Sequence, residues 1–177
     1  MKKFLLLLLL SSLISTAQEK KQKRFYTFSV CGTVVVNENY VLFDKHDGEN
    51  LIEMSGILIR NGMGYQFHRR FVASINFGID FHTRIGMQSI PGYFNVQYNI
   101  WEDEGSQFYV NCSAGKLWQL SSAFDNGNYY SAGLGLQIPT VNRKNVIVKL
   151  DYHRKSIAGF ENGNLDSVSL AIGMTLF

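Results

Sequence analysis

The sequence lacks a long hydrophobic run. Its most apolar stretch, residues 4–14, is too short for a membrane-spanning helix, which needs about 20 residues, and no other stretch is a candidate for one. From residue 25 onward no segment keeps a helical period. These absences exclude a membrane protein built from spanning helices.

Charge of one sign and clustered cysteines are also missing. Removal of residues 1–17 would take away Lys2 and Lys3 and no acidic residue, so the formal net charge of +3 falls to +1. That balance offers no electrostatic basis for binding nucleic acid. The two cysteines, Cys31 and Cys112, lack C-x-x-C and Cys/His metal spacing. They are expected on opposite faces of distant strands, so we predict no disulfide, which would need Cα atoms about 4.4–6.8 Å apart.

The first residues have the pattern of an export signal. A positive start, Met1-Lys2-Lys3, precedes the apolar stretch, and the small residues Ser15-Thr16-Ala17 follow it. We predict a signal peptide over residues 1–17, cleaved after Ala17. The residue before that cut is not cysteine, so no lipid-anchor site is visible there. Residues 18–24 form a charged leader.

The rest of the chain alternates between apolar and polar residues with a period of two, which is typical of strands. In residues 71–82, for example, Phe77, Ile79 and Phe81 alternate with Gly78 and Asp80. Polar or glycine-rich turn segments separate the alternating stretches. Eight strands are predicted, near residues 25–36, 52–67, 71–82, 93–100, 108–117, 129–138, 146–154 and 167–177.

The two faces of these strands indicate where they lie. One face carries rows of Phe, Tyr, Ile, Leu and Val, and the other carries Ser, Asn, Gln, Gly, Thr and a few charges. The last strand sets Val168, Leu170 and Ile172 against Ser169 and Ala171. A soluble barrel fills its interior with large apolar side chains, whereas a membrane barrel turns them toward lipid. Short and longer connections alternate as well, which favours a membrane barrel over a soluble one.

These features resemble the small Gram-negative outer-membrane β-barrel proteins of the porin-like, OmpA/OmpX type. The resemblance rests on the eight segments, on Gly-Met-Gly-Tyr-Gln-Phe at 62–67, on Phe-Gly-Ile-Asp-Phe-His at 77–82, on Ile-Pro-Gly-Tyr-Phe-Asn-Val-Gln-Tyr at 90–98 and on terminal Phe177. It implies an all-β, eight-stranded antiparallel up-and-down transmembrane β-barrel over residues 25–177. In the family, aromatics usually occupy the last and third-last positions, and here position 175 is threonine.

Several polar residues are candidates for a luminal site. Arg60, Asp80, Lys149 and Asp151 fall on the luminal side of the alternation, and we predict a charge network that fills a narrow lumen. His82 and His153 are placed at the outer rim, where a metal site or a lipid-modifying histidine is conceivable. Catalysis there needs a serine within hydrogen-bond reach, and Ser156 is the nearest candidate in sequence, but no motif covers the pair. Aromatic residues near strand ends are expected to form an interfacial girdle; they are Tyr40, Trp101, Trp118, Tyr129, Tyr130 and Tyr152.

The expected function is a small outer-membrane barrel with a filled polar lumen and a structural or surface-recognition role. We predict no catalytic residue, no metal and no cofactor, and we expect a monomer that contacts outer-membrane lipid and no nucleic acid. Two alternatives remain open. One is an outer-membrane enzyme that hydrolyses or transfers acyl chains of lipids, and the other is a secreted, lipocalin-like barrel that binds an apolar ligand.

Overall fold

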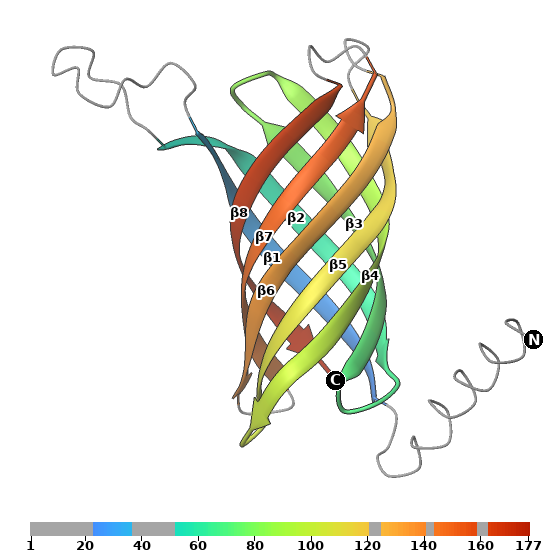
Figure 1. Ribbon diagram of the computed structural model, residues 1–177, viewed down its shortest axis with the longest axis vertical. Coiled ribbons are helices and arrows are strands. Elements are labelled where there is room, and N and C mark those ends of the chain that lie inside the picture. The colour runs from blue at the N-terminus through green and yellow to red at the C-terminus, as the bar shows by residue number, and fades with distance from the viewer. Residues whose placement is uncertain (1–22, 37–51, 121–124, 141–143, 159–162) are drawn as a thin grey trace, which may run out of the picture.

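The chain folds into a closed barrel of eight antiparallel strands (Figure 1), in which β8 pairs back with β1. The computed structural model describes residues 23–36, 52–120, 125–140, 144–158 and 163–177. Within them no helix is long and apolar enough to cross a membrane. The strands are β1 (Lys23–Val36), β2 (Ile52–Gln66), β3 (Phe71–His82), β4 (Met87–Asp103), β5 (Ser106–Gln119), β6 (Gly127–Thr140), β7 (Lys144–Ile157) and β8 (Asn164–Leu176). The predicted fold class and number of strands are confirmed.

The strands extend further than the sequence pattern indicates. β1 begins at Lys23, inside the expected charged leader, whereas residues 1–17 and 18–22 lie outside the described residues. β4 begins at Met87, so Pro91 lies within the strand and not at its start, as predicted. Between the pairs Phe77↔Gly92 and Asp80↔Ser89 the β3–β4 ladder is interrupted. Proline has no backbone N–H to donate, which accounts for the interruption beside Pro91.

The two ends of the barrel are named here by their connections. At the turn end, residues 67–70 join β2 to β3 and residues 104–105 join β4 to β5; at the loop end, residues 83–86 join β3 to β4. Glu104 and Gly105 have φ of 46° and 87°. Positive φ at both central residues is the geometry of the tight hairpin turn whose twist matches its flanking strands. The chain ends beside the turn end, after β8 (Figure 1).

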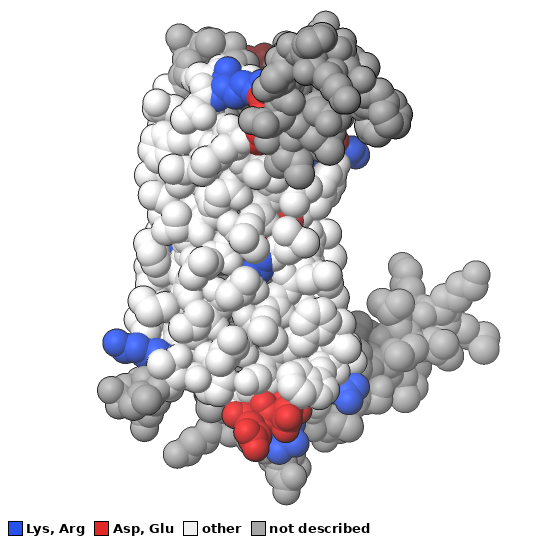
Figure 2. Space-filling model, turned by 90° about the vertical axis from the view of Figure 1, so that its left-hand side faces the viewer, with Lys and Arg blue, Asp and Glu red and all other residues white. Residues whose placement is uncertain are grey.

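The outer face of the wall is apolar. On β8, Leu170 and Ile172 are 57% and 62% exposed, while their neighbour Ser169 is fully buried. Figure 2 shows one side of this wall, where charged residues gather toward the two ends and the middle is almost entirely uncharged. The same outward rows run along the other strands, with exposed Phe28, Val30, Met63, Ile75, Phe77, Ile79, Phe94, Val96, Leu134, Leu136, Val148 and Leu150.

The inner face is mostly polar, as the alternation predicts. The buried polar side chains include Arg60, Asp80, Asp151 and Lys155. Hydrogen bonds join many neutral side chains on this face: the Asn76 amide donates to the Ser74 hydroxyl over 2.9 Å, and other buried members are Ser29, Thr33, Asn99, Asn111, Ser113, Ser131, Gln137 and Thr175. The lumen is therefore filled by a satisfied polar network with a few charges.

The cysteines follow the predicted parity. Cys31 is buried on the luminal side, Cys112 is exposed on the outer face, and both are free thiols. Cys112 pairs with Val96 across the β4–β5 ladder, within the apolar part of the wall. The prediction of no disulfide is confirmed.

This difference in placement gives a labelling test. We expect an apolar maleimide to label Cys112 in folded protein within membranes, because the reagent partitions into the bilayer that would surround this face. A charged, membrane-impermeant maleimide should leave Cys112 unlabelled until detergent and denaturant are added, and Cys31 should react with the apolar reagent only after unfolding. Mass spectrometry of the labelled protein measures both. Rapid labelling of Cys112 by the charged reagent in intact membranes would contradict a lipid-facing wall.

Candidate functional site in the barrel lumen

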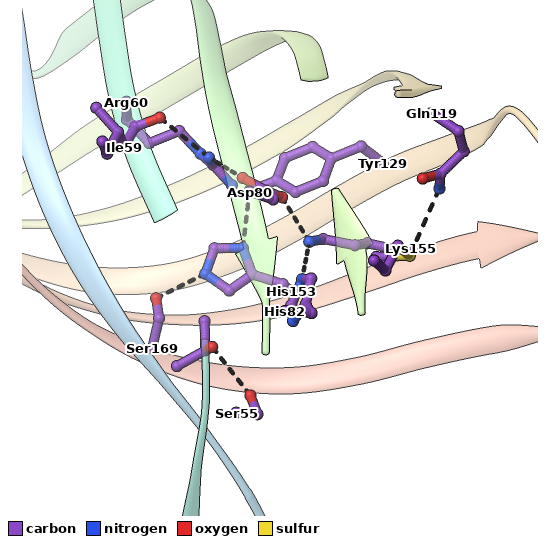
Figure 3. Close-up of polar contacts among 12 residues, drawn as sticks. Ser55, Ile59, Arg60, Asp80, His82, Gln119, Tyr129, His153, Lys155 and Ser169 are labelled. Atoms are coloured by element: carbon purple, nitrogen blue, oxygen red, sulfur yellow. Dashed lines mark hydrogen bonds and ion pairs between the residues drawn. The ribbon is translucent and has the colours of Figure 1, made fainter. Parts of the chain in front are cut away.

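The centre of the lumen holds a carboxylate shared by two cations. Arg60 of β2 donates through its Nη1 to Asp80 Oδ1 in a buried ion pair. On the other side, the Lys155 ammonium of β7 lies 2.5 Å from Asp80 Oδ2. Figure 3 shows the Asp80 carboxylate between the two cationic groups. The sequence places Arg60 and Asp80 close together, and the structure adds Lys155 as a third member from across the barrel.

Local sequence explains how the Arg60 side chain fits into a crowded lumen. Arg60 lies opposite Gly78 in the β2–β3 register. A Cβ on Gly78 would collide with the Ile59 carbonyl oxygen and with the Arg60 side chain. Glycine therefore allows the arginine to run along the wall toward Asp80, two residues further along β3.

The two histidines do not lie on the outer rim, and that interpretation is wrong. His82 and His153 are each only 3% exposed and point into the lumen. The imidazole Nε2 of His82 contacts the Lys155 ammonium. His153 lies between a tyrosine and a serine: its Nδ1 is 2.7 Å from the Tyr129 hydroxyl, and its Nε2 is 2.6 Å from Ser169 Oγ. The strand alternation already pointed inward for both, whereas their position near strand ends suggested the rim.

A second charged group lies on β7 and β5. The Lys149 ammonium is 3.3 Å from Asp151 Oδ2, and the Asn111 amide donates to Asp151 Oδ1 over 3.0 Å. Gly133 faces Asp151 in the β6–β7 register, and a Cβ there would collide with this carboxylate. The four predicted luminal residues thus form two ion pairs, Arg60 with Asp80 and Lys149 with Asp151.

The lumen differs between its two ends. Toward the loop end an apolar plug fills it, formed by Met87, Tyr93, Leu117, Tyr129 and Ile157, with Ile85 and Leu165 packed against them. Toward the turn end lies a cavity of about 70 Å³, whose lining runs from Tyr129 and His153 to Phe25 and Phe177. That volume holds a few water molecules. The apolar plug and the charged centre separate this cavity from the loop end.

The chemistry available here is limited by access. Ser156, the predicted partner of His153, instead donates to the Gly163 carbonyl oxygen over 3.4 Å. Ser169 does contact His153, but it is fully buried in the wall. Among the described residues, no group of three His, Cys, Asp or Glu side chains is placed to hold a metal ion. A lipid acyl chain would have to pass the packed lumen to reach the histidine.

Two luminal residues were missed from the sequence. Tyr129 was assigned to the interfacial girdle, but it is 1% exposed and packs against Tyr93 at a ring-centroid distance of 4.7 Å. It shares its parity with Ser131, which was the signal for an inward position. Lys155 follows the predicted end of its strand at Arg154, and extending the alternation beyond His153 would have placed it inward. The girdle residues Trp101, Trp118, Tyr130 and Tyr152 are exposed, and Tyr40 lies outside the described residues.

Comparison with known proteins relates the fold to membrane barrels. No family model and no curated protein matches the chain. The crystal structure of Neisserial surface protein A is similar in fold, with a TM-score of 0.64 and 6% sequence identity over 89% of this chain and 99% of that chain. A structure described as a de novo designed transmembrane β-barrel has a TM-score of 0.48 and 12% identity over 90% and 98% of the two chains. At these identities the likeness concerns the fold, which is that of the small eight-stranded barrels.

Proposed function

We propose that the mature chain is an integral outer-membrane barrel with a closed lumen and a structural or surface-recognition role. The observation that carries the proposal is the apolar outer wall around a charged interior, which is the reverse of a soluble barrel. The strands, of 12 to 17 residues, are long enough to cross a bilayer, since a tilted transmembrane strand needs about 9–11.

Closure of the wall supports the same proposal. Every strand is paired on both sides, so the barrel leaves no open sheet edge in hydrocarbon, where an unpaired backbone group is costly. The absence of a free edge also favours a monomer, because edge-to-edge pairing of two copies is not available. Contacts with membrane lipid then come from the outward side chains.

The filled lumen favours a non-catalytic, non-conducting protein over a lipid-modifying enzyme. The histidine closest to a serine is buried beneath the wall, and the apolar plug closes the loop end of the lumen. A lipocalin-like carrier would need an apolar cavity, and this cavity is lined mainly by amide, hydroxyl and charged groups. The remaining surface for recognition is the loop end.

Fractionation tests this proposal directly. We expect the mature protein, cleaved after Ala17, in detergent-extracted outer membrane, and we expect the unheated sample to migrate differently from the boiled one in a gel, because a closed barrel resists detergent until heated. An exported soluble eight-stranded barrel is the matched control for fractionation. Recovery of this protein in the soluble periplasmic fraction would rule out the membrane location, and acyl release from lipid that disappears in Ser169→Ala would support the enzyme instead.

A further inference from the structure

The charges of the lumen do not balance among the described residues. Arg60, Lys149 and Lys155 bring three cations to it, while Asp80 and Asp151 bring two carboxylates. Asp151 is matched by Lys149, so Asp80 alone faces both other cations. The contact of His82 Nε2 with the Lys155 ammonium requires this nitrogen to accept a hydrogen bond, so His82 is neutral there and adds no charge.

Arg60 also has an unused edge. Its Nη1 donates to Asp80 and, over 3.2 Å, to the Ile59 carbonyl oxygen. Its Nε and Nη2 are buried and have no hydrogen-bond partner, although the side chain is only 5% exposed. The rings of Tyr93 and Tyr129 flank the guanidinium, with centroids 5.9 and 5.7 Å from its central carbon. Nε and Nη2 form the edge of arginine that binds anions with two parallel hydrogen bonds.

The cavity brings this edge and a second cation to one space. Arg60 and Lys149 both line it, and the Lys149 side chain keeps 20% of its surface exposed. Most of the other lining groups are neutral hydroxyls and amides, which can donate hydrogen bonds. A buried cation with unused donors is costly unless an anion or ordered water satisfies it. One positive charge in excess and about 70 Å³ of space suit one small monovalent anion.

We propose that the cavity binds one small monovalent anion of the size of chloride, held by the Nε–Nη2 edge of Arg60 and the Lys149 ammonium. The ion enters from the turn end, because the apolar plug lies on the other side of the charged centre. It neutralises the excess luminal charge and so stabilises the barrel. This site depends on the lumen alone and not on the role of the outer surface.

Thermal unfolding of the mature barrel in detergent tests the site, at constant ionic strength and with chloride replaced stepwise by gluconate, which is too bulky for the cavity. We expect chloride to raise the unfolding midpoint, increasingly with the logarithm of its concentration, because a ligand of the folded state stabilises it by mass action. Lys149→Met should lose this shift, and Asp151→Asn, which frees Lys149 from its carboxylate, should enlarge it.

The matched control is Arg154→Gln, which removes an exposed outward cation paired with Asp166 and should keep the wild-type shift. An equal chloride effect in all four proteins, or none in the wild type, would overturn the site. If Lys149→Met does not fold, the comparison of Asp151→Asn with the wild type still decides. Crystals grown in bromide should show an anomalous peak beside Arg60, and a peak at that place only in Asp151→Asn would also overturn the proposal. None of these outcomes changes the expected membrane fractionation.

Discussion

Phe77→Arg and, separately, Val96→Arg should prevent stable insertion of the barrel. Both side chains point outward from the apolar wall, with 55% and 42% of their surface exposed. An arginine on the lipid face near the bilayer midplane costs about 2–4 kcal/mol, a large part of the stability of a small domain. We expect loss of the heat-modifiable species and little protein in the outer-membrane fraction.

Phe67→Arg is the matched control for depth. Phe67 is likewise an exposed phenylalanine, 56% exposed, but it lies in the turn between β2 and β3 beside Arg69 and Arg70. Near the interface the cost of arginine falls to about 0–1 kcal/mol, so this variant should insert normally. If Phe67→Arg and Phe77→Arg reach the membrane equally well, the outer wall does not face hydrocarbon.

Asp80→Leu should be the most damaging single change in the lumen. It leaves both Arg60 and Lys155 without their shared carboxylate, and removing one partner of a buried ion pair costs about 3–5 kcal/mol. Arg60→Met should cost less, because Asp80 keeps Lys155. Urea unfolding in detergent, followed by tryptophan fluorescence, measures the free energy of each variant.

The combined variants separate a pair from a triad. From the sequence alone, a double change of Arg60 and Asp80 to apolar residues is expected to recover much of the loss. The structure changes this expectation, because the double variant still leaves Lys155 unpaired, and only Arg60→Met with Asp80→Leu and Lys155→Met removes every charge of the group. Full recovery in the double variant would show that Lys155 does not share the carboxylate, and additive losses would show that Arg60 and Asp80 do not interact.

The sequence by itself determined the class of fold and the face on which most side chains lie. Side chains of a strand alternate because of local backbone geometry, so a row such as Val168, Leu170 and Ile172 identifies the outer face without any knowledge of neighbouring strands. The same rule places Arg60 and Asp80 inside and separates Cys31 from Cys112. Where position near a strand end was preferred to parity, as for Tyr129 and His153, the prediction was wrong.

Only the tertiary structure decided which luminal residues meet across the barrel. Lys155 of β7 reaches Asp80 and His82 of β3, and Tyr129 of β6 meets Tyr93 of β4, although neither pair of strands shares a ladder. Parity gives the direction of a side chain but not its height in the closed barrel, which depends on the register of every ladder in turn. The sharing of one carboxylate by two cations, and the unused edge of Arg60 beside the cavity, follow from that closure.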